Sequence, residues 1–367
     1  VVVLDNLQTG NKRNLAQFSN NKNFTFVKQD VCKPIKLSGK FHYVLNLACP
    51  ASPPKYYADP VHTLETCSIG AKNMLDFALK NKARFFHTST SEVYGDPLEH
   101  PQNENYAGNV VPYCKRSCYD EGKRYAEALI FQYRHEKGLN TGLIRIFNTY
   151  GPLMDPDDGR VVSNFIKQAL SGEDITIQGS GKQTRSFCYV DDQINAQMKF
   201  IHSDLEGPIN IGNPGEFTIL ELAEKVIKHT GSKSKIIHVE AAISDPKQRK
   251  PDIKLAKKLL KWEPKIALDE GRPVVLCFLP THQNQATKDL IKKTLGFFSV
   301  KKPLDKYNYV KIAIVGDITS PEAQRFSVTT LPTTFLLDSY GLPNKRLEGS
   351  VTAQEMIELL GRYAPKK

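Results

Sequence analysis

The chain has 367 residues, of which 40% are hydrophobic and 24% charged, and its formal net charge is +11 at pH 7. This composition is typical of a globular protein, and the length indicates two domains or one large domain. The basic residues are scattered, whereas a nucleic-acid footprint requires a cluster, so we expect no nucleic-acid partner. No apolar run approaches the ~20 residues of a membrane span, and there is no signal-peptide pattern. We therefore expect a cytoplasmic protein without integral membrane contact.

The seven cysteines and nine histidines are also scattered. No two cysteines have the Cys-x-x-Cys spacing, and no histidine joins a cysteine at zinc-finger spacing. An odd, scattered set of cysteines is typical of reduced thiols in a reducing compartment. The sequence predicts no metal site.

The first 150 residues alternate between strand and helix patterns. In chain order the predicted elements are strands at 1–5, 23–30 and 42–48, a helix at 61–81, a strand running into a small-residue turn at 83–95, a helix that contains Tyr119, and a strand at 141–148. This alternation predicts an α/β fold with a parallel sheet. Ligands bind such sheets beyond the carboxyl ends of the strands, so polar residues at those ends are the first candidates for a site.

Tyr119 and Lys123 stand four residues apart, on one face of the predicted helix. A lysine ammonium in that position could lower the pKa of the tyrosine and make its phenolate a usable base. The spacing alone is a weak signal, because it also occurs at Tyr133/Lys137, Tyr307/Lys311 and Tyr363/Lys367. Tyr119 differs from these in lying just downstream of a strand that ends in a Ser/Thr cluster, so we select it as the candidate base.

Eight short stretches occur in an order that resembles one family. They are LDNLQTGNKRN (4–14), ACPASPPKYY (48–57), STSEVYGDP (89–97), RSCYDEGKR (116–124), RIFNTYGP (145–152), DDGRVVSNFI (157–166), QTRSFCYVDD (183–192) and DPKQRKPDI (245–253). Residues 1–271 thereby resemble an extended short-chain dehydrogenase/reductase, and within that superfamily the UDP-glucuronate decarboxylases, also called UDP-xylose synthases. The resemblance implies a Rossmann-like doubly wound parallel sheet, with the substrate-binding parts mainly at 150–180 and 205–265.

The resemblance also implies a reaction. Tyr119 would take the proton of the sugar 4-hydroxyl while NAD takes the hydride. Thr90 would hydrogen-bond the reacting oxygen. Lys123 would keep the phenol acidic and hold the nicotinamide ribose. The resulting 4-keto acid would lose CO2, and the hydride would return to give UDP-xylose. Arg249 would pair with the substrate carboxylate in a fork geometry. Glu92 would orient a water or reprotonate the ring.

Binding residues follow from the same match. Asp5 would accept hydrogen bonds from the adenosine ribose, which favours NAD over NADP. The residues implied for NAD are Asp5, Asn6, Thr9, Gly10, Asp30, Val31, Leu47, Tyr119 and Lys123. The residues implied for UDP-glucuronate are Asn148, Arg160, Val161, Asn164, Arg185 and Arg249.

The chain departs from the family pattern at several places. The glycine-rich turn that cradles the NAD pyrophosphate is not matched, so we expect an N-terminally truncated domain. Cys67 stands where an Asn is common, and Glu65 stands where the decarboxylases carry Lys.

Two alternatives stay open: another NAD-dependent 4-epimerase or 4,6-dehydratase, and an inactive protein that binds UDP-sugars or partners. Family members pair through a helical bundle that includes the Tyr119 helix, which implies a homodimer.

Residues 272–367 resemble a smaller thioredoxin-like α/β domain. Strands are predicted at 273–281 and 309–317 and within 329–341, with helices near 284–297, 320–326 and 349–363 and a cis-proline at Pro332. The Cys-x-x-Cys motif is absent and Cys277 has no partner in sequence, so dithiol exchange is not expected. We expect this part to bind an unknown protein partner or to have no specific function.

Overall fold

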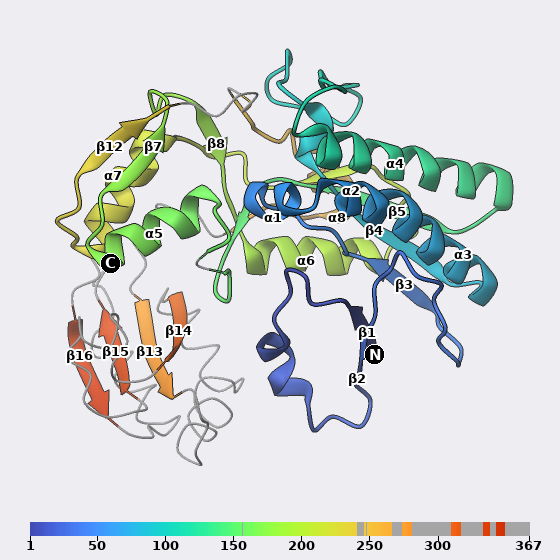
Figure 1. Ribbon diagram of the computed structural model, residues 1–367, viewed down its shortest axis with the longest axis horizontal. Coiled ribbons are helices and arrows are strands. Elements are labelled where there is room, and N and C mark those ends of the chain that lie inside the picture. Colours follow the sequence, from blue (N-terminus) through green and yellow to red (C-terminus); the bar gives the residue numbers. More distant parts are fainter. Residues whose placement is uncertain are drawn as a thin grey trace. The chain divides into compact units, whose positions relative to one another are not determined.

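The computed structural model describes residues 1–155, 157–240, 246 and 248–265, and the backbones of four later strands (Figure 1). The chain divides into two compact units, Val1–Asn164 with Gln178–Ile219 and Glu240–Ala267, and Phe165–Ile177 with Leu220–Val239 and Leu268–Lys367. This division does not follow the boundary predicted after residue 271, because it separates two segments of the expected substrate-binding parts from the first unit. The domain assignment made from the sequence stays a prediction.

The first unit is built on a parallel sheet, which confirms the predicted fold class. Its strand order is β10-β5-β4-β3, and all three ladders are parallel. The strands are β3 (Tyr43–Asn46), β4 (Arg84–Thr90), β5 (Thr141–Ile146) and β10 (Ile209–Ile211). A separate parallel pair consists of β1 (Val2–Asp5) and β2 (Thr25–Lys28).

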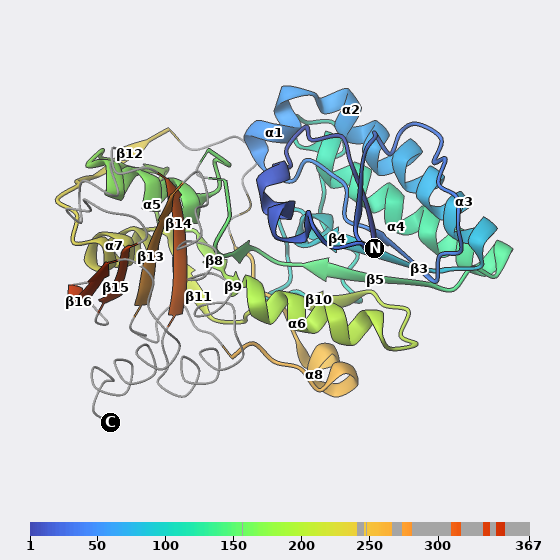
Figure 2. The same cartoon turned by 90° about the horizontal axis from the view of Figure 1, so that it is seen from below.

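Helices cover both faces of the four-stranded sheet (Figure 2). Because successive strand residues point to opposite faces, Phe85 and Phe86 belong to different cores. Phe85 packs with buried residues of α3 (Ala71–Asn81) and α4 (Ser117–Lys137). Phe86 packs with those of α6 (Val190–Ile201) and α8 (Lys254–Leu260). The long helix α4 ends where Gly138 adopts the left-handed conformation, a common helix stop.

The predicted helix at 61–81 is interrupted in the structure. It consists of α2 (Pro60–Glu65), a π-helical turn η2 (Thr66–Gly70) and α3. Such turns occur frequently at functional sites. Here Gly70 lets Val31 approach, since a Cβ on Gly70 would lie 2.7 Å from Val31 Cγ2.

One face of β3 carries exposed apolar side chains. Tyr43 and Leu45, and Leu47 just beyond the strand, are 46%, 41% and 54% exposed, whereas the intervening Val44 is buried. Within the described residues, no ladder joins β1 to β3. No helix of this part of the chain is both long and apolar enough to cross a membrane.

The remaining described elements belong to both compact units. They are η1 (Lys12–Phe18), α1 (Pro53–Ala58), η3 (Ser91–Tyr94), β6 (Thr149–Tyr150), α5 (Val161–Ser171), β7 (Ile175–Gln178), β8 (Thr184–Ser186), β9 (Cys188–Tyr189), β11 (Glu216–Thr218), α7 (Ile219–Thr230) and β12 (Ile236–Val239).

A mixed sheet of order β14-β13-β15-β16 follows in the C-terminal region. Its strands are β13 (Val274–Pro280), β14 (Val310–Gly316), β15 (Thr333–Leu337) and β16 (Pro343–Glu348). The first three occur where the sequence predicts strands. The predicted helices and Pro332 lie outside the described residues, so the thioredoxin-like assignment stays a prediction.

Candidate active site

Tyr119 lies in the first turn of α4 and is buried, with 6% of its surface exposed. Its ring stacks on that of Tyr56, with centroids 5.1 Å apart and planes 9° from parallel. Lys123, one turn further along α4, is also buried, and its Nζ donates to the carbonyl oxygen of Thr88 at 3.0 Å. The helix therefore holds both side chains at the end of β4, as the sequence predicts.

The pKa of Tyr119 is raised well above its ordinary value. Burial is the main cause and the neighbouring Cys49 thiol adds to it, whereas a hydrogen bond with Thr90 acts in the opposite direction. Lys123 Nζ lies 5.9 Å from the centre of the Tyr119 ring and bonds to the backbone instead. In this structure the Lys123 ammonium therefore does not bond to the phenol, and the pKa of Tyr119 is not lowered as the sequence suggested.

Glu92 lies in the short helix η3, directly after β4, and two arginines bind its carboxylate. Arg249 Nη1 donates to Oε1 at 2.7 Å, and Arg116 Nη2 donates to Oε2. Although burial would raise the pKa of Glu92, the charges of Arg249 and Arg116 lower it to about 2. Glu92 is therefore ionised near neutral pH.

Arg249 is 1% exposed and is committed to protein groups. Its guanidinium donates to Ser91 Oγ at 2.9 Å and to the Gly95 carbonyl oxygen at 2.8 Å, besides Glu92. Only Nε lacks a hydrogen-bond partner among the described residues. The fork that the sequence assigned to a substrate carboxylate thus holds Glu92 in this structure.

Asp120 is a buried carboxyl that the sequence reasoning missed. Its Oδ2 lies 3.5 Å from Arg116 Nε, and its Oδ1 has no hydrogen-bond partner in the described structure. Burial and the Glu92 charge raise its pKa to about 7, against the opposing charges of Arg116 and Arg249. The signal was present in RSCYDEGKR, where Asp120 follows the candidate base directly. Two neighbouring carboxyls with divided pKa values are typical of acid–base sites.

Two thiols, those of Cys49 and Cys67, lie near Tyr119 and its helix α4. Cys49 Sγ and Cys67 Sγ lie 3.4 Å apart. Cys49 packs against the Tyr119 cluster, and the Cys67 side chain lies against α4, because a Cβ on Gly122 would lie 3.2 Å from its Sγ. The sequence placed these cysteines eighteen residues apart without indicating that they meet.

Seven of the residues expected to bind NAD line one cavity of about 120 Å³, namely Asp5, Asn6, Thr9, Gly10, Asp30, Val31 and Leu47. Cys49 lines it too, so the cavity leads toward the Tyr119 cluster. Its volume is below the ~300–1,000 Å³ typical of small-molecule sites, so it can hold one part of a dinucleotide. Gly10 fits closely, since a Cβ there would lie 2.9 Å from Asp5 Oδ2.

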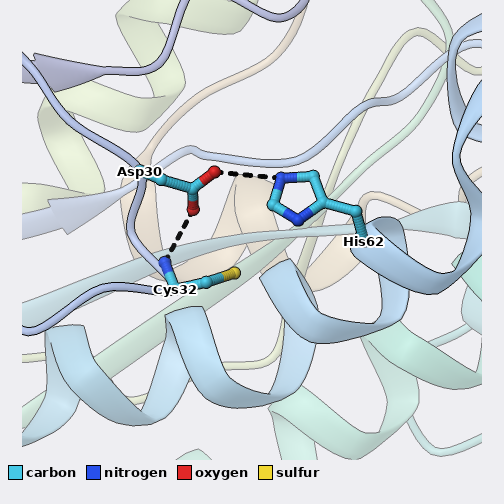
Figure 3. A group of neighbouring side chains, drawn as sticks. All are labelled: Asp30, Cys32 and His62. Atoms are coloured by element: carbon cyan, nitrogen blue, oxygen red, sulfur yellow. Dashed lines mark hydrogen bonds and ion pairs between the residues drawn. The ribbon is translucent and has the colours of Figure 1, made fainter.

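Asp30, which lines this cavity, carries further contacts, and Figure 3 shows them. Its Oδ2 lies 3.1 Å from Nε2 of His62, and its Oδ1 accepts from the backbone N–H of Cys32 at 2.8 Å. Partial burial would raise the pKa of Asp30, but hydrogen bonds from Cys32 and Asn6 keep it below its usual value. The sequence predicted the position of Asp30 but not its two neighbours.

Unlike the residues expected to bind NAD, the residues expected to bind the UDP-sugar do not line one common cavity among those found in the described part of the chain. Arg185 is 9% exposed and its charge lowers the pKa of Glu92, so it belongs to the Glu92 surroundings. Arg160 instead pairs with Asp158. The backbone oxygen of Asn148 accepts from the N–H of Cys188 at 2.8 Å. Val161 and Asn164 lie in the first turn of α5, and no described contact joins them to Tyr119.

A larger cavity, of about 550 Å³, lies elsewhere and contains none of the predicted residues. Its three arginines are paired, Arg145 with Glu127 at 2.8 Å, Arg134 with Glu206 at 2.6 Å and Arg124 with Glu121 at 3.5 Å. Size alone would select this cavity, but the chemistry lies with Tyr119 and Glu92.

Comparisons with known proteins identify the family. A family model described as GDP-mannose 4,6 dehydratase matches residues 1–273. UDP-glucuronic acid decarboxylase 5 of Arabidopsis thaliana is 53% identical over 275 residues, which are 75% of this chain and 80% of that protein. The chain belongs to the UDP-glucuronic acid decarboxylase family.

Solved structures place the family fold in the extended short-chain dehydrogenases/reductases. A UDP-glucose 4-epimerase of Thermotoga maritima with UDP-glucose has a TM-score of 0.66 at 28% identity and covers 74% of this chain and 87% of its own. A UDP-glucuronic acid 4-epimerase of Bacillus cereus, in complex with UDP-glucuronic acid and NAD, has a TM-score of 0.64 at 26% identity, with 73% and 87% covered. The Rossmann-like assignment is therefore confirmed.

Proposed function

We propose that this chain converts UDP-glucuronate to UDP-xylose and CO2 with NAD as its cofactor. The observation that carries the proposal is the convergence of Tyr119, Thr90, Glu92 and Arg249 beside the Asp5–Asp30 cavity, in a chain 53% identical to a UDP-glucuronic acid decarboxylase.

The cavity fits a dinucleotide's adenosine. The Asp5 carboxylate accepts one backbone hydrogen bond, from Leu7 N–H at 2.6 Å, and its remaining lone pairs suit ribose hydroxyls. Gly10 keeps the approach to that carboxylate open. NAD, when bound, supplies the acceptor for the hydride of sugar C4 and a positively charged ring. Lys123 would then hold the nicotinamide ribose.

Tyr119 accepts the proton of the 4-hydroxyl in this proposal, and Thr90 orients the same oxygen. This step requires the phenolate, so the positive charges of Lys123 and of the ring of bound NAD would have to lower the raised pKa of Tyr119 toward the operating pH. The resulting 4-keto group lies β to the carboxylate, so it accepts the electrons released when CO2 leaves. Arg249 acts through Glu92 as a positioning residue, because its donors are bound to Glu92, Ser91 and Gly95. Of the expected arginines, Arg185 is the better candidate for direct contact with UDP-glucuronate.

The test is mass spectrometry of the products after incubation of the full chain with UDP-glucuronate and NAD+. We expect a UDP-pentose and CO2, with activity reduced at least about 100-fold in Tyr119→Phe, in line with loss of a general base. Tyr133→Phe is the matched control, because it has the same Tyr-x-x-x-Lys spacing.

The other outcomes separate the rivals. A UDP-hexuronate with inverted C4 and no CO2 would show a 4-epimerase, and turnover of UDP-glucose instead would show a 4,6-dehydratase. No product and no bound NAD would show a protein that retains the residues without the activity.

A further inference from the structure

We propose that Asp30, Cys32 and His62 form a binding site for a zinc-type divalent cation next to the proposed cofactor cavity, which Asp30 also lines. One potential ligand atom from each lies within 4.8 Å of the other two. Asp30 and Cys32 lie in the loop after β2 and His62 lies in α2, and Figure 3 shows the imidazole and the Cys32 side chain both near the Asp30 carboxylate.

The distance between Asp30 Oδ2 and His62 Nε2 suits coordination of one metal ion. Two N/O ligands each about 2.0 Å from a tetrahedral zinc ion lie about 3.3 Å apart. Asp30 Oδ2 and His62 Nε2 are 3.1 Å apart. Carboxylate, imidazole and thiolate are the ligand types that zinc accepts, and three protein ligands leave the fourth position to water.

Each ligand has a supporting partner. His62 Nδ1 faces Glu65 Oε2 at 3.7 Å, the carboxylate–histidine arrangement that fixes the tautomer of a metal ligand. Asp30 Oδ2 also accepts from Asn6 Nδ2 at 2.8 Å. The Cys32 thiol lies 3.9 Å from Thr66 Oγ1.

The local charge is negative, which favours a cation. Burial raises the pKa of the Cys32 thiol to about 11, and the charges of Asp30 and Glu65 add to this. A divalent ion removes that penalty, because a coordinating thiol is deprotonated outright.

Zinc bound at this site would affect NAD binding, and this consequence rests on the proposed function. Asp30 lines the cavity assigned to the adenosine of NAD. A cation on Asp30 would withdraw its carboxylate from that cavity, so zinc and NAD would compete.

The experiment is titration of the reduced full chain with zinc chloride against a chromophoric chelator. We expect one ion per chain at this site, with binding weakened at least tenfold in Cys32→Ser and in His62→Gln. His100→Gln is the matched control, because His100 Nε2 lies the same 3.1 Å from a carboxylate, that of Glu216, but has no thiol in the group. Equal zinc affinity in wild type and both site variants would overturn the site.

A second titration addresses the competition alone. Zinc should raise the apparent Kd for NAD in wild type and not in His62→Gln. If zinc binds without raising this Kd, the metal site stands and the competition is overturned. If NAD does not bind at all, the result counts against the proposed function and not against the metal site.

The geometry points independently to a second site, a reversible disulfide between Cys49 and Cys67. Their Sγ atoms, 3.4 Å apart, need to approach to about 2.05 Å. With a peroxide as oxidant, one thiol gives a sulfenic acid and water, and the other displaces a second water as the S–S bond forms. Cys49 lines the cofactor cavity, which gives the oxidant a route to the pair.

The bond would connect the loop after β3 to the π-helical turn, on the side where Cys49 packs against Tyr119 and Cys67 against Gly122. We expect peroxide to remove two titratable thiols and 2 Da, reversibly with a dithiol, in wild type and in Cys114→Ser but not in Cys67→Ser. A Cys67→Ser chain that still forms an internal disulfide at Cys49, or a wild type that forms none with Cys67, would overturn the proposal. Neither readout depends on activity.

Discussion

Glu92 and Asp120 share Arg116, yet their surroundings separate their pKa values. Arg249 binds Glu92 and holds its pKa at about 2, and the resulting negative charge, with burial, raises that of Asp120 to about 7. The residue that the sequence reasoning missed is therefore the one whose charge changes near neutral pH.

We expect the Asp120 carboxyl carbon to titrate near pH 7 in an NMR experiment on the full chain. Glu92→Gln should move that titration to lower pH, because the charge that raises it is gone. A titration near the ordinary value of ~3.9 in wild type would contradict the assignment. If Asp120 takes part in turnover, Asp120→Asn should also remove an ionisation near pH 7 from the profile of kcat/KM.

Acid stability follows from the same pair. Since the folded pKa of Glu92 is below its usual value of 4.5, its contribution is complete above pH 4.5 and is lost as pH falls toward 2. The raised pKa of Asp120 acts oppositely, with a contribution complete below 3.8 and lost as pH rises through 7.

Glu92→Gln should therefore flatten the loss of unfolding free energy between pH 4.5 and 2. At neutral pH it should lower the unfolding free energy by about 3–5 kcal/mol, because the buried Arg249 loses its carboxylate partner and Arg116 keeps only Asp120. Urea unfolding at several pH values measures both effects. Glu263→Gln, at an exposed ion pair with Lys257, is the control and should leave the curve nearly unchanged.

At the scale of elements, the turn after β4 sets the site. Gly95 has φ 63° and ψ −140°, which residues with a Cβ rarely adopt, and a Cβ there would lie 1.9 Å from the backbone oxygen of Asn109. Its carbonyl oxygen also holds Arg249. A turn signal was visible in STSEVYG, but its contact with residue 249 was not.

Gly95→Ala should lower the unfolding free energy by more than about 2 kcal/mol and reduce any turnover. Gly138→Ala is the control, since it has the same φ of 63° but a left-handed ψ of 22° and no atoms within 4 Å of the added Cβ. It should cost only about 1 kcal/mol. Equal losses in the two variants, measured by denaturant unfolding, would contradict the steric argument.

At the scale of the whole molecule, we expect the homodimer that the family resemblance implies. Val61, Leu64 and Tyr125 are 66%, 42% and 51% exposed, on α2 and α4, and Leu64 adjoins Gly122 of α4. Apolar side chains gathered on neighbouring helices are typical of an interface.

Val61→Glu with Tyr125→Glu should shift the sedimentation coefficient from dimer to monomer. Tyr113→Glu, at a residue 98% exposed, should not. A wild-type chain that sediments as a monomer at micromolar concentration would contradict the homodimer.

The sequence by itself determined the parallel α/β fold, the family and the residues that line the proposed cofactor cavity. The fold followed because strand and helix periodicities are local, whereas the family and the cavity residues were implied by short stretches that resemble the decarboxylases in their order. The tertiary structure alone decided what Arg249 binds, that Asp120 titrates near neutral pH, that Cys49 meets Cys67 and that Asp30, Cys32 and His62 converge. Each of these depends on distances between side chains far apart in the chain and on the burial that shifts a pKa, and neither quantity is present in the order of the residues.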